Sequence, residues 1–248
     1  MLVGDVEFVQ NVPQDLREGY AALNKARGIE HFTTQPPHDG VAVIVGGGPS
    51  LADFVEEIRM RKQNGQMIWT VNNTYSYLME RGIEPDAHVF LDSRQQNVEF
   101  VRPGPRVTYY LDVRCHPDIY EKTSGCKRIM YGFDHSATGH TVGLKALYLT
   151  AMSGFRMIHL YGFDSSYREL KHHAYEQPLN DRENVCEIRL KDGSTFLTAP
   201  WMAQQADEFQ YIANSLAEQD CEIHVHGDGL LPRVAQLMMQ PEPQEYYL

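Results

Sequence analysis

The sequence predicts an α/β protein built around one doubly wound, mostly parallel β-sheet. Three observations lead to this prediction. Short apolar runs alternate with segments of helical periodicity along most of the chain. The first run, VAVIV at 41–45, has no polar position, which is typical of a strand buried on both faces. It leads into GGGPSL at 46–51, a glycine turn that opens a helix.

The remaining elements are expected around the glycine turn at 41–51. Gly46, Gly47 and Gly48 would allow positive φ and close approach to a ligand, and the helix that follows points its positive end at the turn. Ser50 adds a hydroxyl donor. We expect a phosphate-binding turn, and the alternative is a tight turn that binds nothing. Neither the dinucleotide fingerprint nor the P-loop is present, since no third glycine follows at the place the fingerprint requires and no Gly-Lys-Ser/Thr ends the loop.

The later elements follow in order along the chain. Strands are expected at 67–71, 87–91, 107–111, 128–132, 157–161 and 221–225, and helices at 73–81, 139–153, 203–218 and 231–239. The helix at 139–153 and the strand after it are expected near the middle of the sheet. A polar insertion at 165–184 is expected to form a lid. Residues 186–198 then predict a small hairpin that turns at Asp192 and Gly193.

The chain organisation predicts one main domain. Residues 1–40 form a lead-in with a short helix at 15–26, residues 41–240 form the nucleotide-binding domain, and residues 241–248 form a frayed acidic tail. A chain of 248 residues can bury a large core without disulfides or metals.

Composition excludes several functional classes. The net charge is -11 and the 22 Lys and Arg form no run, which argues against nucleic acid or an anionic membrane as a partner. A small anionic ligand held by backbone amides remains compatible. The four cysteines, Cys115, Cys126, Cys186 and Cys221, lack paired metal spacing, so we expect reduced thiols, no metal site and a cytoplasmic location. The sequence contains no stretch of about 18 apolar residues, so no membrane span is predicted.

Polar residues follow the predicted strands, where a doubly wound sheet binds its ligand. They are Asn72 and Asn73, then Asp92, Ser93 and Arg94, then Asp164, Ser165 and Ser166. Amides can read a base or ribose, and Asp92 could accept ribose hydroxyls or bind magnesium. The alternative is that Asn72 and Asn73 cap the next helix and that Asp164 caps its loop.

Histidines supply the candidate acid-base groups. His135, His140, His172 and His173 lie in predicted loops or helix starts, whereas His159, His224 and His226 fall in strands and are expected to be packed or on the surface. His140 precedes Thr141 at the start of a helix. The positive end of that helix attracts an anion and favours the neutral form of the imidazole. His173 would reach the site when the lid closes. Adjacent side chains point different ways, so at most one of His172 and His173 is expected to face the site. The catalytic prediction is therefore His140 and His173, and the alternative is local hydrogen bonding.

Four segments carry a resemblance to a known superfamily. They are VGGGPSL, VNNTYSYLMERGIEPDAHVFLDS, TGHTVGLKALYLTAMSGFRMIHLYGFDSSY and HHAYEQPLND. They resemble the superfamily of archaeal 6-hydroxymethylpterin diphosphokinase and bacterial motility accessory factors, most closely its small phage-type members of unassigned activity. The chain is more distantly similar to bacterial sialyltransferases that use CMP-sugars, whose GNGPSL, SGV and GIDFY segments align with 46–51, 141–143 and 162–167. The resemblance implies a Rossmann-like nucleotide site that includes Gly47, Gly48, Ser50, Asn72 and Asn73.

The chain departs from both relatives at their catalytic motifs. The diphosphokinase has acidic Asp-Leu-Asp-Gly and Asp-Gly-Asp motifs for magnesium-ATP, and here those places read LDSR at 91–94 and GHTV at 139–142, so only Asp92 matches. Two or more carboxylates usually hold magnesium and its phosphates. The sialyltransferases place a catalytic histidine just before the helix at 203–218, where this chain has Thr198, Ala199 and Pro200.

These residues together predict a nucleotide-binding transferase that moves a sugar from a nucleotide-activated donor. One alternative is diphosphoryl transfer from magnesium-ATP to a pterin-like acceptor, and another is a non-catalytic nucleotide-binding protein. The expected partner is a nucleotide or nucleotide-sugar, and magnesium is expected only if ATP is the donor. The predicted nucleotide-binding residues are Gly46, Gly47, Gly48, Ser50, Asn72, Asn73, Asp92, Thr141 and Asp164.

Overall fold

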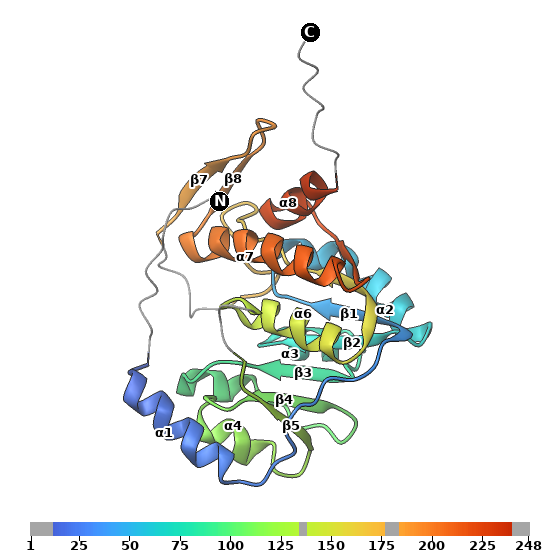
Figure 1. Ribbon diagram of the computed structural model, residues 1–248. Coiled ribbons are helices and arrows are strands. Elements are labelled where there is room, and N and C mark those ends of the chain that lie inside the picture. Colours follow the sequence, from blue (N-terminus) through green and yellow to red (C-terminus); the bar gives the residue numbers. More distant parts are fainter. Residues whose placement is uncertain (1–11, 134–137, 177–183, 240–248) are drawn as a thin grey trace.

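A computed structural model describes residues 12–133, 138–176 and 184–239. Its centre is a seven-stranded sheet in the order β5-β4-β3-β2-β1-β6-β9 (Figure 1). The strands are β1 (His38–Val45), β2 (Met67–Val71), β3 (Ala87–Phe90), β4 (Thr108–Asp112), β5 (Lys127–Tyr131), β6 (Phe155–Tyr161) and β9 (Glu222–Val225). Each neighbouring pair in this sheet is parallel. The predicted α/β fold class is confirmed.

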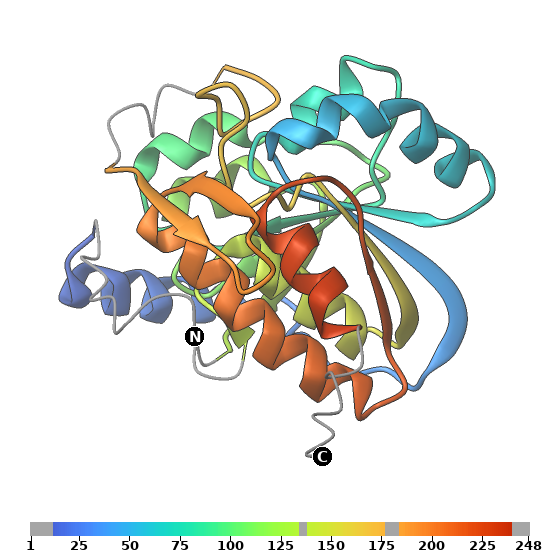
Figure 2. The same ribbon diagram turned by 90° about the horizontal axis from the view of Figure 1, so that it is seen from above.

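Helices connect these strands and cover both faces of the sheet. They are α1 (Gln14–Lys25), α2 (Val55–Gln63), α3 (Thr74–Met79), α4 (Pro117–Lys122), α6 (Val142–Met152), α7 (Pro200–Ala217) and α8 (Leu230–Met238), with 3-10 helices η1 (Pro49–Phe54) and η2 (Gln95–Phe100). The predicted hairpin is confirmed as β7 (Cys186–Arg189) and β8 (Thr195–Thr198). In the view from above, α8 lies beside α7 (Figure 2).

The second half of strand β1 shows why the run at 41–45 has no polar position. Ala42 and Ile44 pack in the cluster that includes residues of α6 and α7, whereas Val43 and Val45 pack in the cluster that includes residues of α2 and α3. All four side chains are fully buried. Alternate residues of a strand point to opposite faces, so a strand covered on both sides must be apolar throughout.

Three details differ from the expectations. The segment after the glycine turn begins as the 3-10 helix η1 and becomes α-helical at Val55. Helix α6 lies over β1, β2, β3 and β6, but β6 is second from the edge because β9 extends the sheet beyond it. Strand β1 begins at His38, inside the expected lead-in at 1–40. The helix of that lead-in is packed on the sheet domain, since Asn24 of α1 is buried and its Nδ2 donates 2.9 Å hydrogen bonds to Val113 O and Cys115 O.

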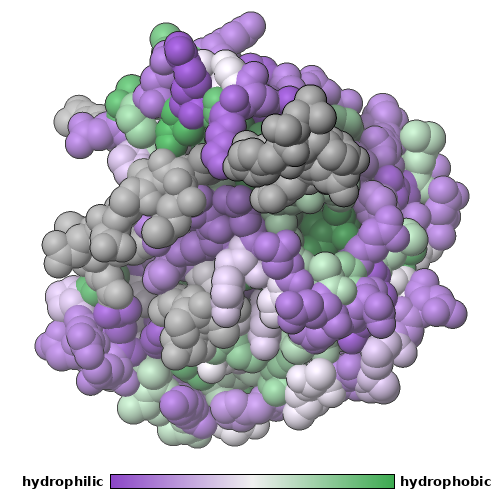
Figure 3. Space-filling view, turned by 45° about the horizontal axis from the view of Figure 1, so that its top comes forward, coloured by the Kyte–Doolittle hydropathy of each residue, from purple (hydrophilic) through white to green (hydrophobic). Residues whose placement is uncertain are grey.

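The surface is mainly hydrophilic in the view of Figure 3, with smaller hydrophobic patches between the hydrophilic residues. Among the described residues, no helix is both long and apolar enough to cross a membrane. The four cysteines form no disulfide with one another.

Candidate functional site

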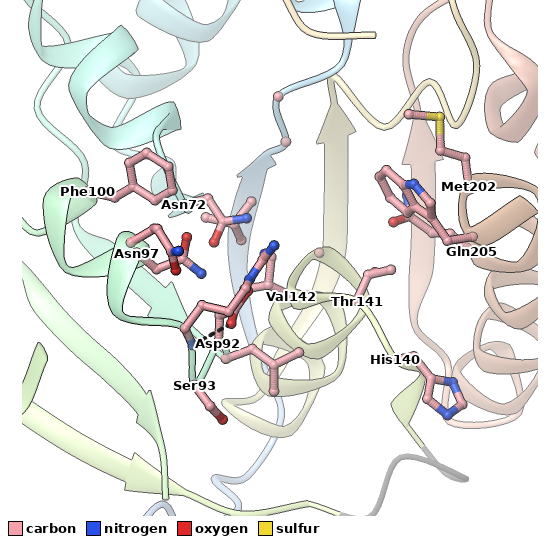
Figure 4. Close-up of a pocket in the computed structure, with 18 of the residues that line it drawn as sticks. Asn72, Asp92, Ser93, Asn97, Phe100, His140, Thr141, Val142, Met202 and Gln205 are labelled. Atoms are coloured by element: carbon pink, nitrogen blue, oxygen red, sulfur yellow. Dashed lines mark hydrogen bonds and ion pairs between the residues drawn. The ribbon is translucent and has the colours of Figure 1, made fainter. Parts of the chain in front are cut away.

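A cavity of about 1050 Å³ opens at the carboxyl ends of the central strands. Its walls come from the turns after β1, β2, β3 and β6, from η2, from the start of α6 and α7, and from α1 (Figure 4). Of the residues predicted from the sequence, it is lined by Gly46, Gly47, Gly48, Asn72, Asp92, His140, Thr141, Asp164 and His173. Ser50 and Asn73 do not line it.

Two of the three backbone amides of the glycine turn form hydrogen bonds with other backbone groups of the protein. Gly46 N–H donates to Tyr161 O and Gly48 N–H donates to Gly162 O, each at 2.8 Å. The Gly47 N–H makes no hydrogen bond with the part of the chain that the structure describes. The Gly46 and Gly48 amides are therefore used within the fold, which leaves the Gly47 N–H as the amide of this turn that could meet a phosphate.

These glycines are required by close packing and not by positive φ. None of the three has positive φ, and the left-handed residue in this region is Gly162, at φ 68°. A Cβ on Gly46 would lie 2.6 Å from Gly162 O, which no side chain tolerates. The turn after β1 and the turn after β6 are thus in backbone contact.

Asp164 and Ser50 lock these two turns together. The Asp164 Oδ2 accepts a hydrogen bond from Ser50 N–H at 3.1 Å and from Ser50 Oγ at 2.9 Å. Ser50 is fully buried and Asp164 is 2% exposed. Burial raises the pKa of Asp164, against the lowering effect of the two Ser50 hydrogen bonds. The predicted ligand role of the Ser50 hydroxyl is corrected, because that hydroxyl is used inside the protein.

Asn72 and Asn97 form one wall of the cavity. Asn72 directly follows β2 and lies in the left-handed region at φ 48°, a conformation that asparagine adopts more readily than most residues. Asn97 on η2 is 2% exposed, and its Nδ2 has no hydrogen-bond partner within the described residues. Figure 4 shows both side chains beside Phe100. Asn97 was missed because η2 is a short 3-10 helix with no apolar periodicity.

Asn73 does not contribute to this wall. It is the N-cap residue of α3, but its side chain makes no capping hydrogen bond. The hydroxyl of Thr74 instead contacts Val45 O at 3.0 Å and Val71 O at 2.7 Å, which ties the end of β2 to the end of β1. Asn73 does not line the cavity, and its predicted nucleotide contact stays a prediction.

The carboxylate of Asp92 is engaged by Arg94. Arg94 N–H donates to Asp92 Oδ1 at 2.8 Å and Arg94 Nε donates to Asp92 Oδ2 at 2.7 Å. Arg114 pairs in the same way with the buried Asp112, with its Nε 2.9 Å from Oδ1. Among the described residues, no group of three or more His, Cys, Asp or Glu is arranged to hold a metal ion.

His140 is held by Glu208, a partner that sequence reasoning missed. Its backbone N–H donates to Glu208 Oε2 at 2.9 Å, and its Nδ1 contacts Glu208 Oε1. Helix α6 begins two residues later, and Thr141 caps it by accepting the Leu144 N–H at 3.3 Å. His140 therefore lies next to a carboxylate 68 residues away in sequence, and its position is not set by the helix start alone.

The segment at 172–175 lies against the glycine turn. Ala174 N–H donates to Gly47 O at 3.0 Å, and the rings of His172 and His173 both line the cavity with centroids 4.3 Å apart. The expectation that only one of these histidines faces the site is wrong. Burial lowers the pKa of His173 to about 3, so its imidazole is neutral near pH 7. His135 lies outside the described residues.

Comparison with known proteins identifies the family. Residues 16–170 match the family described as 6-hydroxymethylpterin diphosphokinase MptE-like. The chain belongs to this MptE-like family. This confirms the resemblance stated from the sequence segments.

Two solved structures are similar to this MptE-like protein. A MAf glycosyltransferase from Magnetospirillum magneticum AMB-1 is 18% identical, with a TM-score of 0.67, over 90% of this chain and 38% of that chain. The chain thus spans about two fifths of that protein. A mammalian sialyltransferase in complex with Gal-beta-1-3GalNAc-ortho-nitrophenol is 13% identical, with a TM-score of 0.46, over 89% of this chain and 88% of that chain. No curated protein matches the chain.

The cavity of this MptE-like protein combines three kinds of group. The first turn of α6 brings Val142 and Gly143 to the wall, where the free N–H groups and positive end of a helix attract anions. Amide side chains lie at one side, with Phe100 available for stacking (Figure 4). His140 lies at the opposite side of the view. This arrangement can hold a phosphate in the middle and a ring at one end.

Proposed function

We propose that this protein binds a nucleotide-activated sugar in the cavity and transfers the sugar to a hydroxyl group. The observation that carries the proposal is the buried Asn97 amide beside Asn72, whose Nδ2 has no partner in the described part of the chain. A buried amide without a partner is costly, and the polar edge of a nucleoside would satisfy it after a small adjustment of the wall. Phe100 would stack on the base.

The phosphates would lie at the start of α6. Thr141, Val142 and Gly143 line the cavity there, and the helix has 11 residues, enough for a full terminal dipole. The Gly47 N–H adds one further donor from the glycine turn. This placement moves the phosphate away from Ser50, whose hydroxyl is occupied by Asp164.

His140 would accept the proton of the acceptor hydroxyl. Glu208 orients the imidazole through Nδ1, the arrangement that general bases commonly use. The acceptor oxygen forms a bond to the anomeric carbon while the bond from that carbon to the phosphate oxygen breaks, and the nucleotide leaves with the electron pair. His173 is too weak a base for this step, because its pKa lies near 3, and it is assigned a hydrogen bond to the donor.

Diphosphoryl transfer with magnesium-ATP is the second candidate, favoured by the family description. It needs carboxylates that can turn to a metal ion. The carboxylates among the described cavity-lining residues are Asp92 and Asp164. Arg94 engages both oxygens of Asp92, and Ser50 engages Oδ2 of Asp164, so Asp164 Oδ1 is the one carboxylate oxygen of this pair without a partner among the described residues. Magnesium with its phosphates usually needs more carboxylate oxygens than these two residues leave available, so sugar transfer is favoured over diphosphoryl transfer.

A thermal-shift panel tests the proposal. The full chain is heated with CMP, UDP, GDP, ATP and their sugar conjugates, with magnesium or with EDTA. We expect at least one nucleotide sugar to raise the Tm in EDTA, and mass spectrometry to show that sugar moving to a hydroxyl acceptor or to water. Stabilisation by magnesium-ATP alone would favour the diphosphokinase, and stabilisation without turnover would favour a binding protein.

A further inference from the structure

We infer that the end of the cavity beside α1 binds an anionic group of the acceptor, with Arg17 as the cation that recognises it. This inference rests on the proposed function, because it assigns the second substrate of the same site. The ligand chemistry is a carboxylate or a phosphate on a hydroxyl-bearing molecule.

Arg17 lies in the wall of the cavity and has no ion pair with any residue that the structure describes. It lines the cavity together with Leu16 and Tyr20 of α1 and with His116. The Arg17 Nε is buried and has no hydrogen-bond partner, and no ion pair of this guanidinium occurs within the described residues. The helix that carries it is fixed in place, since Asn24 anchors α1 to the loop after β4.

The charges around Arg17 leave its own charge uncompensated. The other two arginines of the cavity wall have partners, Arg94 with Asp92 and Arg114 with Asp112. A partly buried cation that forms no ion pair with the described residues is unfavourable unless it meets an anion. A guanidinium can bind both oxygens of a carboxylate or phosphate at once.

The position of Arg17 suits an acceptor more than a donor phosphate. Helix α1 packs on α4, and its Asn24 binds the loop after β4, whereas the glycine turn follows β1. Strands β2 and β3 lie between β1 and β4 in the sheet, and strands are spaced about 4.8 Å apart, so the two ends of the cavity are about 14 Å apart. That length can hold two substrates in succession.

The test uses glucose, glucuronate and glucose 6-phosphate as probes that differ in their charged group. Binding to the full chain is measured by saturation-transfer difference NMR, with the donor end filled by whichever nucleotide raises the Tm. The parent should bind glucuronate or glucose 6-phosphate and not glucose, and the stronger of the two identifies the anion. Arg17→Gln should weaken that binding by about ten- to a hundredfold, and Arg17→Lys should restore part of it.

Arg106→Gln is the matched control, because the Arg106 side chain is 78% exposed, pairs with Glu84 and lies outside the cavity wall. It should leave binding unchanged. Arg17→Gln should keep the Tm within about 2 °C of the parent, since Arg17 makes no ion pair with the described residues. Equal binding of glucose and both anionic probes, or unchanged binding in Arg17→Gln, overturns the inference. Failure of every nucleotide to raise the Tm overturns the proposed function instead.

Discussion

Asp164 accepts two hydrogen bonds from Ser50 through a single carboxylate oxygen, although the two residues are 114 positions apart in the sequence. One of these bonds comes from the backbone at the start of η1 and the other from the hydroxyl. The contact fixes the turn after β6 against the turn after β1. The contact therefore fixes the part of the cavity wall that contains Asp164 before a ligand binds.

Removing this carboxylate should destabilise the protein. Asp164→Ala leaves the Ser50 N–H and hydroxyl without partners in a buried place, so the free energy of unfolding should fall by about 2–4 kcal/mol. Ser50→Ala removes one of the two bonds and should cost about 1 kcal/mol. Urea unfolding of both variants and of the double variant gives the coupling. Additive losses would contradict a shared interaction.

The buried histidine of β3 should make stability depend on pH. His88 is fully buried, its Nδ1 lies 2.8 Å from Thr70 Oγ1, and desolvation lowers its pKa to about 3 from an ordinary 6.5. The contribution of the neutral imidazole to stability is fully present above pH 6.5. It is lost as the pH falls toward the pKa of about 3 that His88 has in the folded protein, by at most about 1.4 kcal/mol per pH unit.

The measurement compares urea unfolding at pH 7 and at pH 5. His88→Leu should remove this part of the acid-side slope, whereas His31→Gln, at an exposed position, should keep it. A parental slope in His88→Leu would show that other groups cause the acid sensitivity.

A side chain at the middle glycine should displace the segment at 172–175. A Cβ on Gly47 would lie 2.5 Å from Tyr175 Oη and 2.9 Å from the His173 ring, so Gly47→Val cannot keep both contacts. We expect faster trypsin cleavage after Lys171, read by mass spectrometry, and weaker nucleotide binding. Gly125→Val is the control, since a Cβ there has no neighbour within 4 Å. A parental cleavage rate would show that the segment is held elsewhere.

The His140–Glu208 pair should act as one catalytic unit. His140→Ala should lower kcat by about a hundredfold or more while donor binding stays close to the parent. Glu208→Gln should lower kcat less, and the double variant should be no slower than His140→Ala. His173→Ala should raise KM more than it lowers kcat. Independent, multiplying losses from His140 and Glu208 would contradict the pairing.

The sequence predicted the sheet because short, mainly apolar runs alternate with segments of helical periodicity, and the run at 41–45 and its glycine turn were recognised from local pattern alone. The site was predicted in outline, since polar residues after parallel strands must meet at one edge. Its detail depends on long-range pairs. Whether Ser50 faces a ligand or Asp164, and whether His140 meets Glu208, is decided by contacts that no local spacing reveals.

The direct test of the account is calorimetric titration of the full chain with CMP-, UDP- and GDP-sugars in EDTA, repeated on Asn97→Ala. The account predicts that at least one nucleotide sugar binds with one-to-one stoichiometry, and that Asn97→Ala weakens it by about tenfold while retaining the parental Tm to within about 2 °C. Absence of binding by every nucleotide sugar, or binding that Asn97→Ala leaves unchanged, would contradict it.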